Sequence, residues 1–339
     1  MRVSVLGAGA MGSALTVPLC DNGVEVCLWG TEYDTEILKK IENGEEHPRI
    51  GVKLPDVEVV HPEKLDYALD GADVVVLAVS TVGVVPVFRR IKDYLNDEAL
   101  ITISKGLLEA DGKVVTIPEA IWKEKEYSDK TVAITGPSIA REVAHRLPTK
   151  VLFSSAEPET AERMADLFST DYYRVEVSDD IKGAEITAAL KNVYSIGISW
   201  VRGYEQSYDM EMDNLRGVIA SMALDEIGRI VEAYGGRRET VYGLSGFGDV
   251  IATFKGGRNG MLGELLGRGL SIEESLDELK RRGVGVIEGY VATEKAYRLV
   301  KELEDDGKLS MDDLTLFMKI YQVLYENGKV KDALEEILR

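Results

Sequence analysis

The first half of the chain alternates short, almost uninterrupted runs of Val, Ile and Leu with segments of helical pattern. Strands that are apolar on both faces belong to parallel sheets covered by helices on both sides. Alternation of strand and helix therefore predicts a doubly wound, mostly parallel sheet. Two later runs are expected to extend this sheet, and antiparallel pairing is open to them. The runs lie at residues 2–7, 24–29, 57–60, 73–79, 99–104 and 131–135, followed by 151–155 and 172–177.

The pattern changes after Ser178, where helical periodicity replaces strands. Ser178-Asp179-Asp180 is typical of a helix start, with a capping oxygen and acids at the positive end of the helix. Segments 271–283, 291–307 and 311–328 repeat apolar residues at helical spacing. We therefore predict a Rossmann-type α/β domain over residues 1–180 and an all-helical C-terminal domain over 181–339, a size that suits two cores.

The charge and composition exclude several classes of protein. The formal net charge of −19 disfavours binding to nucleic acid or anionic membranes. The chain contains no long apolar run of membrane-spanning length, and its first apolar run ends at glycines without a cleavage pattern, so neither a membrane span nor a signal peptide is expected. The two cysteines, Cys20 and Cys27, fall in a predicted helix and the next strand, which suits a reducing cytoplasm.

The sequence GAGAMG at residues 7–12 follows the first strand and opens the first helix. This context makes it a strong dinucleotide-binding signal. Gly7 permits the tight turn, Gly9 lets a pyrophosphate approach the backbone, and Gly12 lets helix and strand pack closely. The next strand ends at Trp29-Gly30, with Glu32 slightly later and no Arg between residues 30 and 38, so the choice between NAD and NADP stays open.

Three other strands end in polar or glycine-containing loops, where ligands of such sheets bind. These loops are Ser80-Thr81, Ser104-Lys105-Gly106 and Gly136-Pro137-Ser138. Lys105 is placed to meet a phosphate or a cofactor, although a solvated loop lysine has the same local sequence. Gly136-Pro137-Ser138 suits a helix start with N–H groups for a substrate, and ordinary capping is the alternative.

Lys191 is the only charged residue between Ile186 and Val201, and its helical neighbours are small. Burial among apolar residues would depress the pKa of this lysine and fit it for general acid–base work. The small neighbours would leave space for a substrate, and Asn192 and Ser195 are placed to orient it. The alternative is a lysine whose stem follows an interface out to water.

A glycine-rich stretch, GLSGFGDVIATFKGGRNG, occupies residues 243–260. Asp249 and Thr253 are four residues apart, which places them on one face of a short helix. Gly256-Gly257 exposes backbone donors, and Arg258 offers a planar guanidinium suited to phosphate. The stretch predicts an anion site, with a mobile surface loop as the alternative.

Six motifs in this order resemble NAD(P)-dependent sn-glycerol-3-phosphate dehydrogenases over nearly the whole chain: GAGAMG, LWG at 28–30, SKGL at 104–107, GPS at 136–138, LKNV at 190–193 and GFGDVIATFKGGRN at 246–259. The resemblance implies reversible hydride transfer between NAD(P)H and dihydroxyacetone phosphate, giving sn-glycerol 3-phosphate for phospholipid synthesis. It also implies a homodimer. The residues after LWG are Thr31-Glu32-Tyr33, whereas many members of the family have a basic residue or His there. This segment therefore gives no support to a preference for NADP.

The resemblance assigns roles to individual residues. Lys191 matches the general acid/base, with Lys105 and Asp249 completing the polar catalytic site. The substrate-contacting positions are Lys105, Gly136, Ser138, Lys191, Asp249, Thr253, Gly257, Arg258 and Asn259, of which Arg258 and Asn259 meet the phosphate. The cofactor-contacting positions are Gly7, Gly9, Ala10, Met11, Gly12, Lys105, Ala140, Arg258 and Glu288.

Two other interpretations stay open on the residues. A two-domain dehydrogenase for a hydroxy acid would need a carboxylate site in place of the GGRN phosphate site. A non-catalytic dinucleotide-binding regulator would keep GAGAMG without a reason for Lys191 beside Asp249. No metal site is expected, because His47, His61 and His145 are scattered without ligand spacing.

Overall fold

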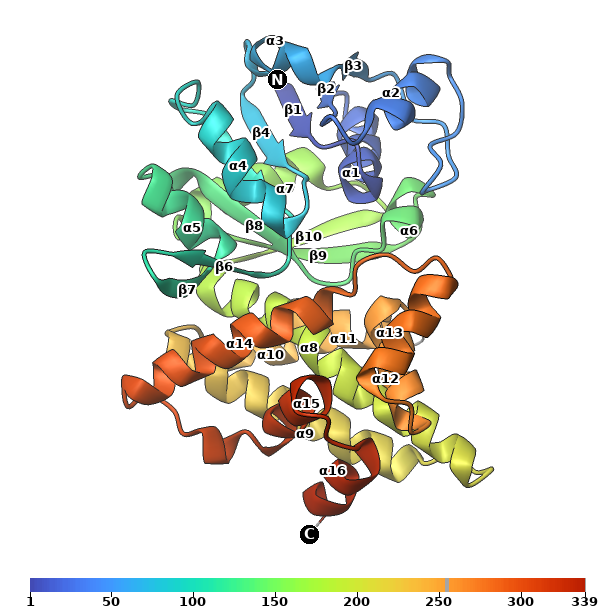
Figure 1. Cartoon of the computed structure of the whole chain (residues 1–339). Helices are drawn as coiled ribbons and strands as arrows, with labels where there is room; N and C mark the ends of the chain where they lie inside the picture. The colour runs from blue at the N-terminus through green and yellow to red at the C-terminus, as the bar shows by residue number, and fades with distance from the viewer. Residues whose placement is uncertain (254–255, 339) are drawn as a thin grey trace. The chain divides into compact units, whose positions relative to one another are not determined.

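The computed structural model describes residues 1–253 and 256–338 (Figure 1). By its contacts the chain divides into two compact units, and we describe each by itself. The first unit comprises Met1–Ala110 and Thr116–Glu185, and the second comprises Asp111–Val115 and Ile186–Arg339.

The first unit is built on one eight-stranded sheet with the order β10-β9-β8-β5-β4-β1-β2-β3. All its pairings are parallel except β8 with β9, so the predicted doubly wound sheet is confirmed, with one antiparallel pair among the later strands. The strands are β1 (Arg2–Leu6), β2 (Glu25–Trp29), β3 (Glu58–Val60), β4 (Val74–Leu77), β5 (Ala99–Thr102), β8 (Thr131–Thr135), β9 (Thr149–Ser154) and β10 (Tyr173–Ser178).

Helices and short 3-10 turns connect these strands. Helix α1 contacts both α6 and α7, and α4 contacts α5. The helices are α1 (Ala10–Asp21), α2 (Thr35–Glu42), α3 (Leu65–Leu69), α4 (Thr81–Ile91), α5 (Ile117–Glu124), α6 (Ala140–Ala144) and α7 (Pro158–Phe168).

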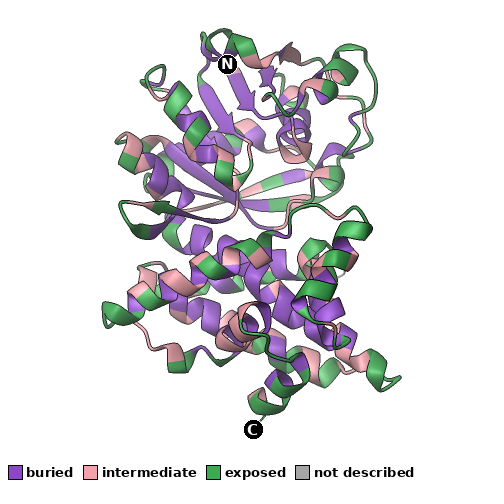
Figure 2. Cartoon of the chain, in the orientation of Figure 1, coloured by how far each residue is buried: buried purple, intermediate pink, exposed green. Residues whose placement is uncertain are grey.

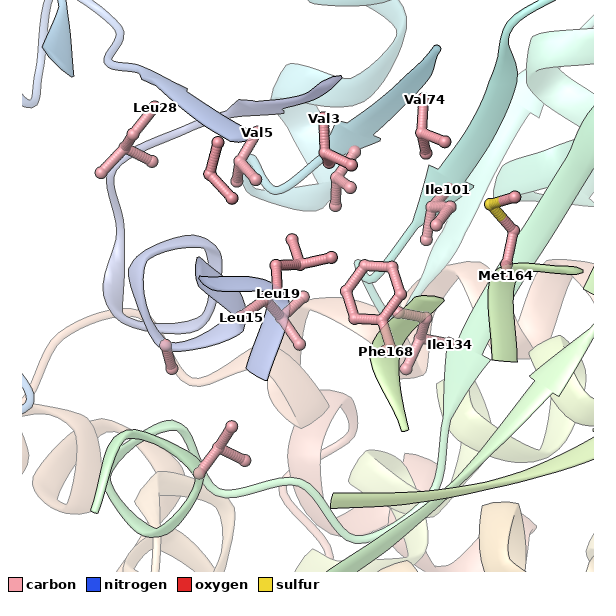
Figure 3. Packing of buried hydrophobic residues seen from close by; sticks show 14 of the residues in the cluster. Val3, Val5, Leu15, Leu19, Leu28, Val74, Ile101, Ile134, Met164 and Phe168 are labelled. Carbon is pink, nitrogen blue, oxygen red and sulfur yellow. The ribbon is translucent and has the colours of Figure 1, made fainter. Parts of the chain in front are cut away.

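The core of this unit lies between the sheet and α1 (Figure 3). Leu15 and Leu19 of α1 pack with Val3 and Val5 of β1 and with Phe168 of α7, and none of the five is more than 1% exposed. Full burial of each such side chain contributes roughly 1.5–3 kcal/mol. This packing fixes the end of β1 and the beginning of α1, between which the glycine loop lies.

A hairpin that the sequence analysis did not predict joins β6 (Leu107–Ala110) to β7 (Lys113–Thr116). Its turn consists of Asp111 and Gly112, both with positive φ, which is the geometry that an Asp-Gly dipeptide favours. In the second unit, the Val114 amide donates to both carboxylate oxygens of Glu302 at 3.2 Å.

The second unit is helical, and after β10 the described residues contain no strand, as predicted. Its longest helix, α8, is buried on nearly all sides, which Figure 2 shows as an almost continuous purple ribbon. The helices are α8 (Ile181–Tyr204), α9 (Asp213–Tyr234), α10 (Glu239–Tyr242), α11 (Asp249–Thr253), α12 (Arg258–Gly267), α13 (Ile272–Arg281), α14 (Glu288–Asp305), α15 (Thr315–Tyr325) and α16 (Val330–Ile337).

Glycines let two helices approach the backbone of α8. A Cβ atom on Gly263 of α12 would overlap the carbonyl oxygen of Ile196, and one on Gly289 of α14 would overlap that of Asn192. Because α12 and α14 lie directly against it, α8 has no solvent-exposed face in this region. A polar side chain of α8 must therefore form its hydrogen bonds or ion pairs inside the unit.

Candidate functional site

The glycine loop joins β1 to α1 in the first unit. Gly7 has φ +121°, and a Cβ atom there would lie 2.5 Å from the carbonyl oxygen of Ala78. A Cβ on Gly12 would overlap the carbonyl oxygen of Gly7, so α1 packs against the loop only because residue 12 has no side chain. Gly9 precedes α1 and carries no capping side chain, so the positive end of this helix faces the loop. The geometry fits the pyrophosphate of a dinucleotide.

Arg49 lies beside this loop, although the sequence analysis did not single it out. A Cβ built on Gly9 would lie 3.8 Å from Arg49 Nη1, and no other atom outside the local chain would approach within 4 Å. His47 holds this segment in place, because its Nε2 is 3.1 Å from the carbonyl oxygen of Ala8. Burial lowers the pKa of His47, which keeps the ring neutral. No local motif marks Arg49, since only the fold brings it to the loop.

The last residues of β2 do not include the acid that often binds the ribose of NAD at this position. Trp29 is fully buried, and the Arg90 guanidinium lies 5.3 Å from the centroid of its ring. The amide and hydroxyl of Thr31 both donate to the Asp34 carboxylate, at 2.9 and 2.8 Å. Glu32 is exposed. Asp34 is therefore already occupied, and Glu32 is the one acid of this turn open to solvent.

The three loops at the strand ends are tied together in the first unit. Lys105 Nζ donates to the carbonyl oxygen of Gly136 at 3.0 Å, and the Thr81 hydroxyl donates to the carbonyl oxygen of Lys105 at 3.4 Å. Ser104 Oγ donates to the carbonyl oxygen of Val79 at 2.5 Å. Three motifs found separately in the sequence thus form one cluster around Lys105.

The segment Gly136-Pro137-Ser138 is not itself the start of a helix, contrary to our expectation. Helix α6 begins at Ala140, with Ile139 as its N-cap and no side-chain cap. Gly136 has φ +96°, a conformation that turns the chain after β8 instead of starting a helix. Ser138 Oγ lies 3.8 Å from Met11 Sδ, which connects this loop to the beginning of α1.

The predicted cofactor positions Ala10, Met11 and Ala140 gather in the first unit. All three are half-buried and pack against the hydrophobic cluster between the sheet and α1. The side chains of these three residues pack inward, so it is the backbone beside them that is available to contact a ligand.

The centre of the second unit contains a buried ion pair. Lys191 Nζ of α8 lies 2.7 Å from Asp249 Oδ1 of α11, and their side chains are 5% and 3% exposed. The carboxylate compensates the charge of the ammonium group, which burial alone would disfavour. Asp249 and Thr253 lie one turn apart in α11, as predicted, and Thr253 Oγ1 donates to the carbonyl oxygen of Asp249 at 2.8 Å. The Ser195 hydroxyl donates to the Lys191 carbonyl at 2.6 Å.

The GGRN segment leads into α12. Gly257 has φ +93° and is the N-cap, which brings Arg258 to the first position of the helix. Arg258 Nη2 pairs with Glu288 Oε1 at 3.0 Å, and both side chains are about half exposed (46% and 53%). The guanidinium therefore has solvent-facing donors besides this pair. Phe254 and Lys255 of the same glycine-rich stretch lie outside the described residues.

Asn259 connects three helices of the second unit. Its Nδ2 donates to Asn192 Oδ1 at 3.1 Å, and its Oδ1 accepts from the Gly289 amide at 2.8 Å. Much of the side-chain amide is thus engaged in fixing α12 to α8 and α14. The sequence predicts for Asn192 only a role in orienting the substrate or the lysine. Its place in this network follows from the close approach of α14.

Neither a metal-binding cluster nor a membrane-spanning helix is found within the described ranges. In residues 1–253 and 256–338, no group of three or more His, Cys, Asp or Glu side chains is arranged to hold a metal ion. Over the same ranges, none of the helices combines the length and apolar character needed to cross a membrane.

Comparisons with known proteins cover both units. Family models described as the NAD-dependent glycerol-3-phosphate dehydrogenase N-terminus and C-terminus match residues 2–161 and 180–335. The chain is 59% identical over 338 residues, 99% of each protein, to an NADP(+)-dependent glycerol-3-phosphate dehydrogenase of Archaeoglobus fulgidus. It is 34% identical over 341 residues to a glycerol-3-phosphate dehydrogenase [NAD(P)+] of Carboxydothermus hydrogenoformans, covering 98% of this chain and 95% of that protein. A solved glycerol-3-phosphate dehydrogenase of Coxiella burnetii superposes with a TM-score of 0.82 at 25% identity, covering 100% and 98% of the two chains.

Proposed function

The chain belongs to the family of NAD-dependent glycerol-3-phosphate dehydrogenases, and we propose that its role in the cell is to reduce dihydroxyacetone phosphate to sn-glycerol 3-phosphate for phospholipid synthesis. It is an NAD(P)-dependent oxidoreductase. The observation that carries the proposal is the buried pair of Lys191 and Asp249. A regulator that only bound a dinucleotide would have no need of such a pair, because burying two charges is costly.

Lys191 supplies the proton in this proposal. When bound, NAD(P)H supplies the hydride that reduces the carbonyl carbon. The Lys191 ammonium donates one proton to the ketone oxygen, and the resulting amine takes the proton back in the oxidation direction. Asp249 orients Nζ and compensates its charge at 2.7 Å. The Thr253 hydroxyl holds the first turn of α11, on which Asp249 lies.

Cationic and backbone donors hold the substrate phosphate in our proposal. Arg258 presents its guanidinium at the first position of α12, where the positive end of the helix adds to its charge. Gly257 contributes an N–H without a side chain to obstruct it. Asn259 acts chiefly by holding α12 against α8 and α14, since both polar atoms of its side chain are engaged there.

Arg49 supports NADP(H) as the preferred cofactor. Its guanidinium lies against the glycine loop, where an anionic ribose substituent would gain a bidentate partner. At the end of β2 the Asp34 carboxylate is occupied by Thr31, which leaves Glu32 as the one acid of that turn open to solvent. Arg49 lies outside residues 30–38, the segment in which a basic residue selective for NADP is expected from sequence. The NADP(+)-dependent relative at 59% identity supports the same preference.

A cytoplasmic homodimer is part of the same proposal. The family resemblance supports the dimer, and the two cysteines without a disulfide support a reducing compartment. Light scattering combined with gel filtration measures the subunit number directly.

Steady-state kinetics test the function. Purified protein should oxidise NADPH in the presence of dihydroxyacetone phosphate, with a higher kcat/KM than with NADH. Dihydroxyacetone without its phosphate and a branched 2-keto acid are the two control substrates. Turnover of the keto acid but not of dihydroxyacetone phosphate would replace our proposal with the hydroxy-acid dehydrogenase. The absence of turnover with any of the substrates would favour the regulator.

A further inference from the structure

A cavity of about 430 Å³ lies in the second unit, outside the residues that we assign to catalysis. Its walls are the end of α8, the segment that leads from α12 into α13, and the segment that leads from α15 into α16. Neither Lys191 nor Arg258 lines it. Small-molecule pockets have volumes of roughly 300–1,000 Å³, so this cavity is large enough for a small ligand.

The floor of this cavity is apolar. It consists of Leu266 of α12, Val323 of α15 and Val330 of α16, none of which is more than 4% exposed. Buried aliphatic side chains offer no hydrogen bond, so the part of a ligand that lies on them must itself be apolar. The floor therefore fits an aliphatic group.

The rim of the cavity is basic. Arg268 at the C-cap of α12, Lys329 before α16 and Lys331 in its first turn line the cavity, together with one acid, Glu274. All four are exposed. The Glu274 carboxylate is already engaged, because it accepts from the amide of Ser271 at 2.8 Å. Three cations thus face one engaged acid, in a chain whose formal net charge is −19.

Nearby carboxylates compensate these cations only in part. Arg268 pairs with Glu264, one turn earlier in α12, and Lys331 Nζ lies 4.0 Å from Glu335 Oε1 in α16. Exposed pairs within one helix contribute little, so both cations can still bind an anion. Lys329 forms no ion pair with any of the residues that the structure describes. The rim therefore has positive charge available for a ligand.

We propose that this cavity is an effector site for an amphiphilic monophosphate, whose phosphate meets the three cations of the rim and whose aliphatic part lies on the floor. A phosphate monoester carries a charge of about −1.5 to −2 near pH 7, which matches several cations better than a single carboxylate does. The binding goes beyond the proposed function, whereas the effect of binding on substrate affinity rests on it.

The helices α8 and α12 connect this cavity to the proposed phosphate site. α12 begins at Arg258 and ends at the cavity, where Gly267 forms part of the lining. A Cβ atom on Gly267 would lie 2.1 Å from the carbonyl oxygen of Trp200, and one on Gly203 would lie 2.0 Å from that of Glu264. With the two backbones in contact, no side chains lie between them to absorb a shift of α12. A ligand that displaces the end of α12 therefore also displaces Arg258.

Calorimetric titration with hexyl phosphate tests the binding. The complete enzyme is first saturated with NADP⁺ and dihydroxyacetone phosphate, a combination that cannot react and that occupies the catalytic site. Hexyl phosphate should still bind. Hexanol and inorganic phosphate, which each carry one half of the ligand, should bind at least roughly 10-fold more weakly. The variant Lys329→Glu, which reverses a charge of the rim, should weaken hexyl phosphate binding by a similar factor.

Steady-state kinetics test the effector role. Bound hexyl phosphate should change the KM for dihydroxyacetone phosphate at least about fivefold in the wild type, and should have no effect on Lys329→Glu at the same concentration. Without hexyl phosphate, Lys329→Glu should match the wild type. Lys301→Glu is the matched control, because Lys301 is an exposed lysine of α14 that does not line the cavity. It should respond as the wild type does.

Three results would overturn the proposal. They are the absence of hexyl phosphate binding to the saturated enzyme, undiminished binding in Lys329→Glu, and a KM that bound hexyl phosphate leaves unchanged. Turnover of dihydroxyacetone phosphate by the wild type without hexyl phosphate tests the dehydrogenase function separately, so the two hypotheses fail on different observations.

Discussion

Lys191 Nζ lies 2.7 Å from Asp249 Oδ1, and both side chains are almost wholly buried. The two residues come from α8 and from the short helix α11, which follows a glycine-rich turn. Their juxtaposition turns an isolated lysine of the sequence into a charge-compensated proton donor, and the first two of our predictions depend on it.

Replacing Lys191 by Ala should lower kcat by roughly 10²-fold or more, because the variant lacks the group that protonates the ketone oxygen. Steady-state kinetics with dihydroxyacetone phosphate and NADPH measure the loss. Lys182→Ala is the control on the same helix, since the Lys182 side chain is 45% exposed and pairs only loosely with Glu119. A Lys191→Ala enzyme with nearly normal kcat would remove this residue from the mechanism.

Asp249→Asn should destabilise the protein by about 3–5 kcal/mol, because it leaves the buried ammonium without a compensating charge. Urea unfolding monitored by circular dichroism measures the change. The double variant Lys191→Met/Asp249→Leu should recover most of that stability while staying inactive. If the double variant were as unstable as Asp249→Asn, packing and not charge compensation would explain the loss.

Arg258→Ala should chiefly raise the KM for dihydroxyacetone phosphate, by roughly 10- to 100-fold, as expected for the loss of a charge-assisted hydrogen bond worth about 1.5–3 kcal/mol. The activity with unphosphorylated dihydroxyacetone should change little. Arg268→Ala, at the C-cap of the same helix, is the matched control. An unchanged KM for the phosphorylated substrate would contradict the phosphate assignment.

Arg49→Ala should weaken the use of NADPH much more than that of NADH, because only NADPH carries the additional phosphate. We expect the ratio of the two kcat/KM values to fall by roughly 10-fold or more. Arg163→Ala, an exposed arginine on α7, controls for loss of surface charge. Equal losses with both cofactors would place Arg49 on the shared part of the dinucleotide.

Glu226 should make the stability of the protein depend on pH. Burial raises its pKa to about 7, although it accepts hydrogen bonds from the Leu316 and Phe317 amides and from the Tyr194 hydroxyl. Because the folded-state pKa exceeds the unfolded value, the contribution is fully present below about pH 4.5 and is lost as the pH rises through 7. The loss is about 3 kcal/mol. The difference in unfolding free energy between wild type and Glu226→Gln should shrink over this interval, and a constant difference would contradict the prediction.

The sequence alone determined the features that depend on local pattern. Apolar runs located the eight strands of the main sheet, because a strand buried on both faces requires them over its whole length. The strands β3 and β10 at the two ends of the sheet are only partly buried, and their runs are shorter or interrupted by charged residues. The change to helical periodicity after Ser178 located the helical part for the same kind of reason. The β6–β7 hairpin was missed, although its Asp111-Gly112 turn is a local signal.

The tertiary structure decided which side chains meet. Lys191 and Asp249, Lys105 and the Gly136 carbonyl, and Arg49 and Gly9 are each pairs from separate segments, and no periodicity within a segment encodes their approach. Local sequence selects the backbone conformation of each segment, whereas long-range packing sets the distances and the burial on which the chemistry of these charges depends.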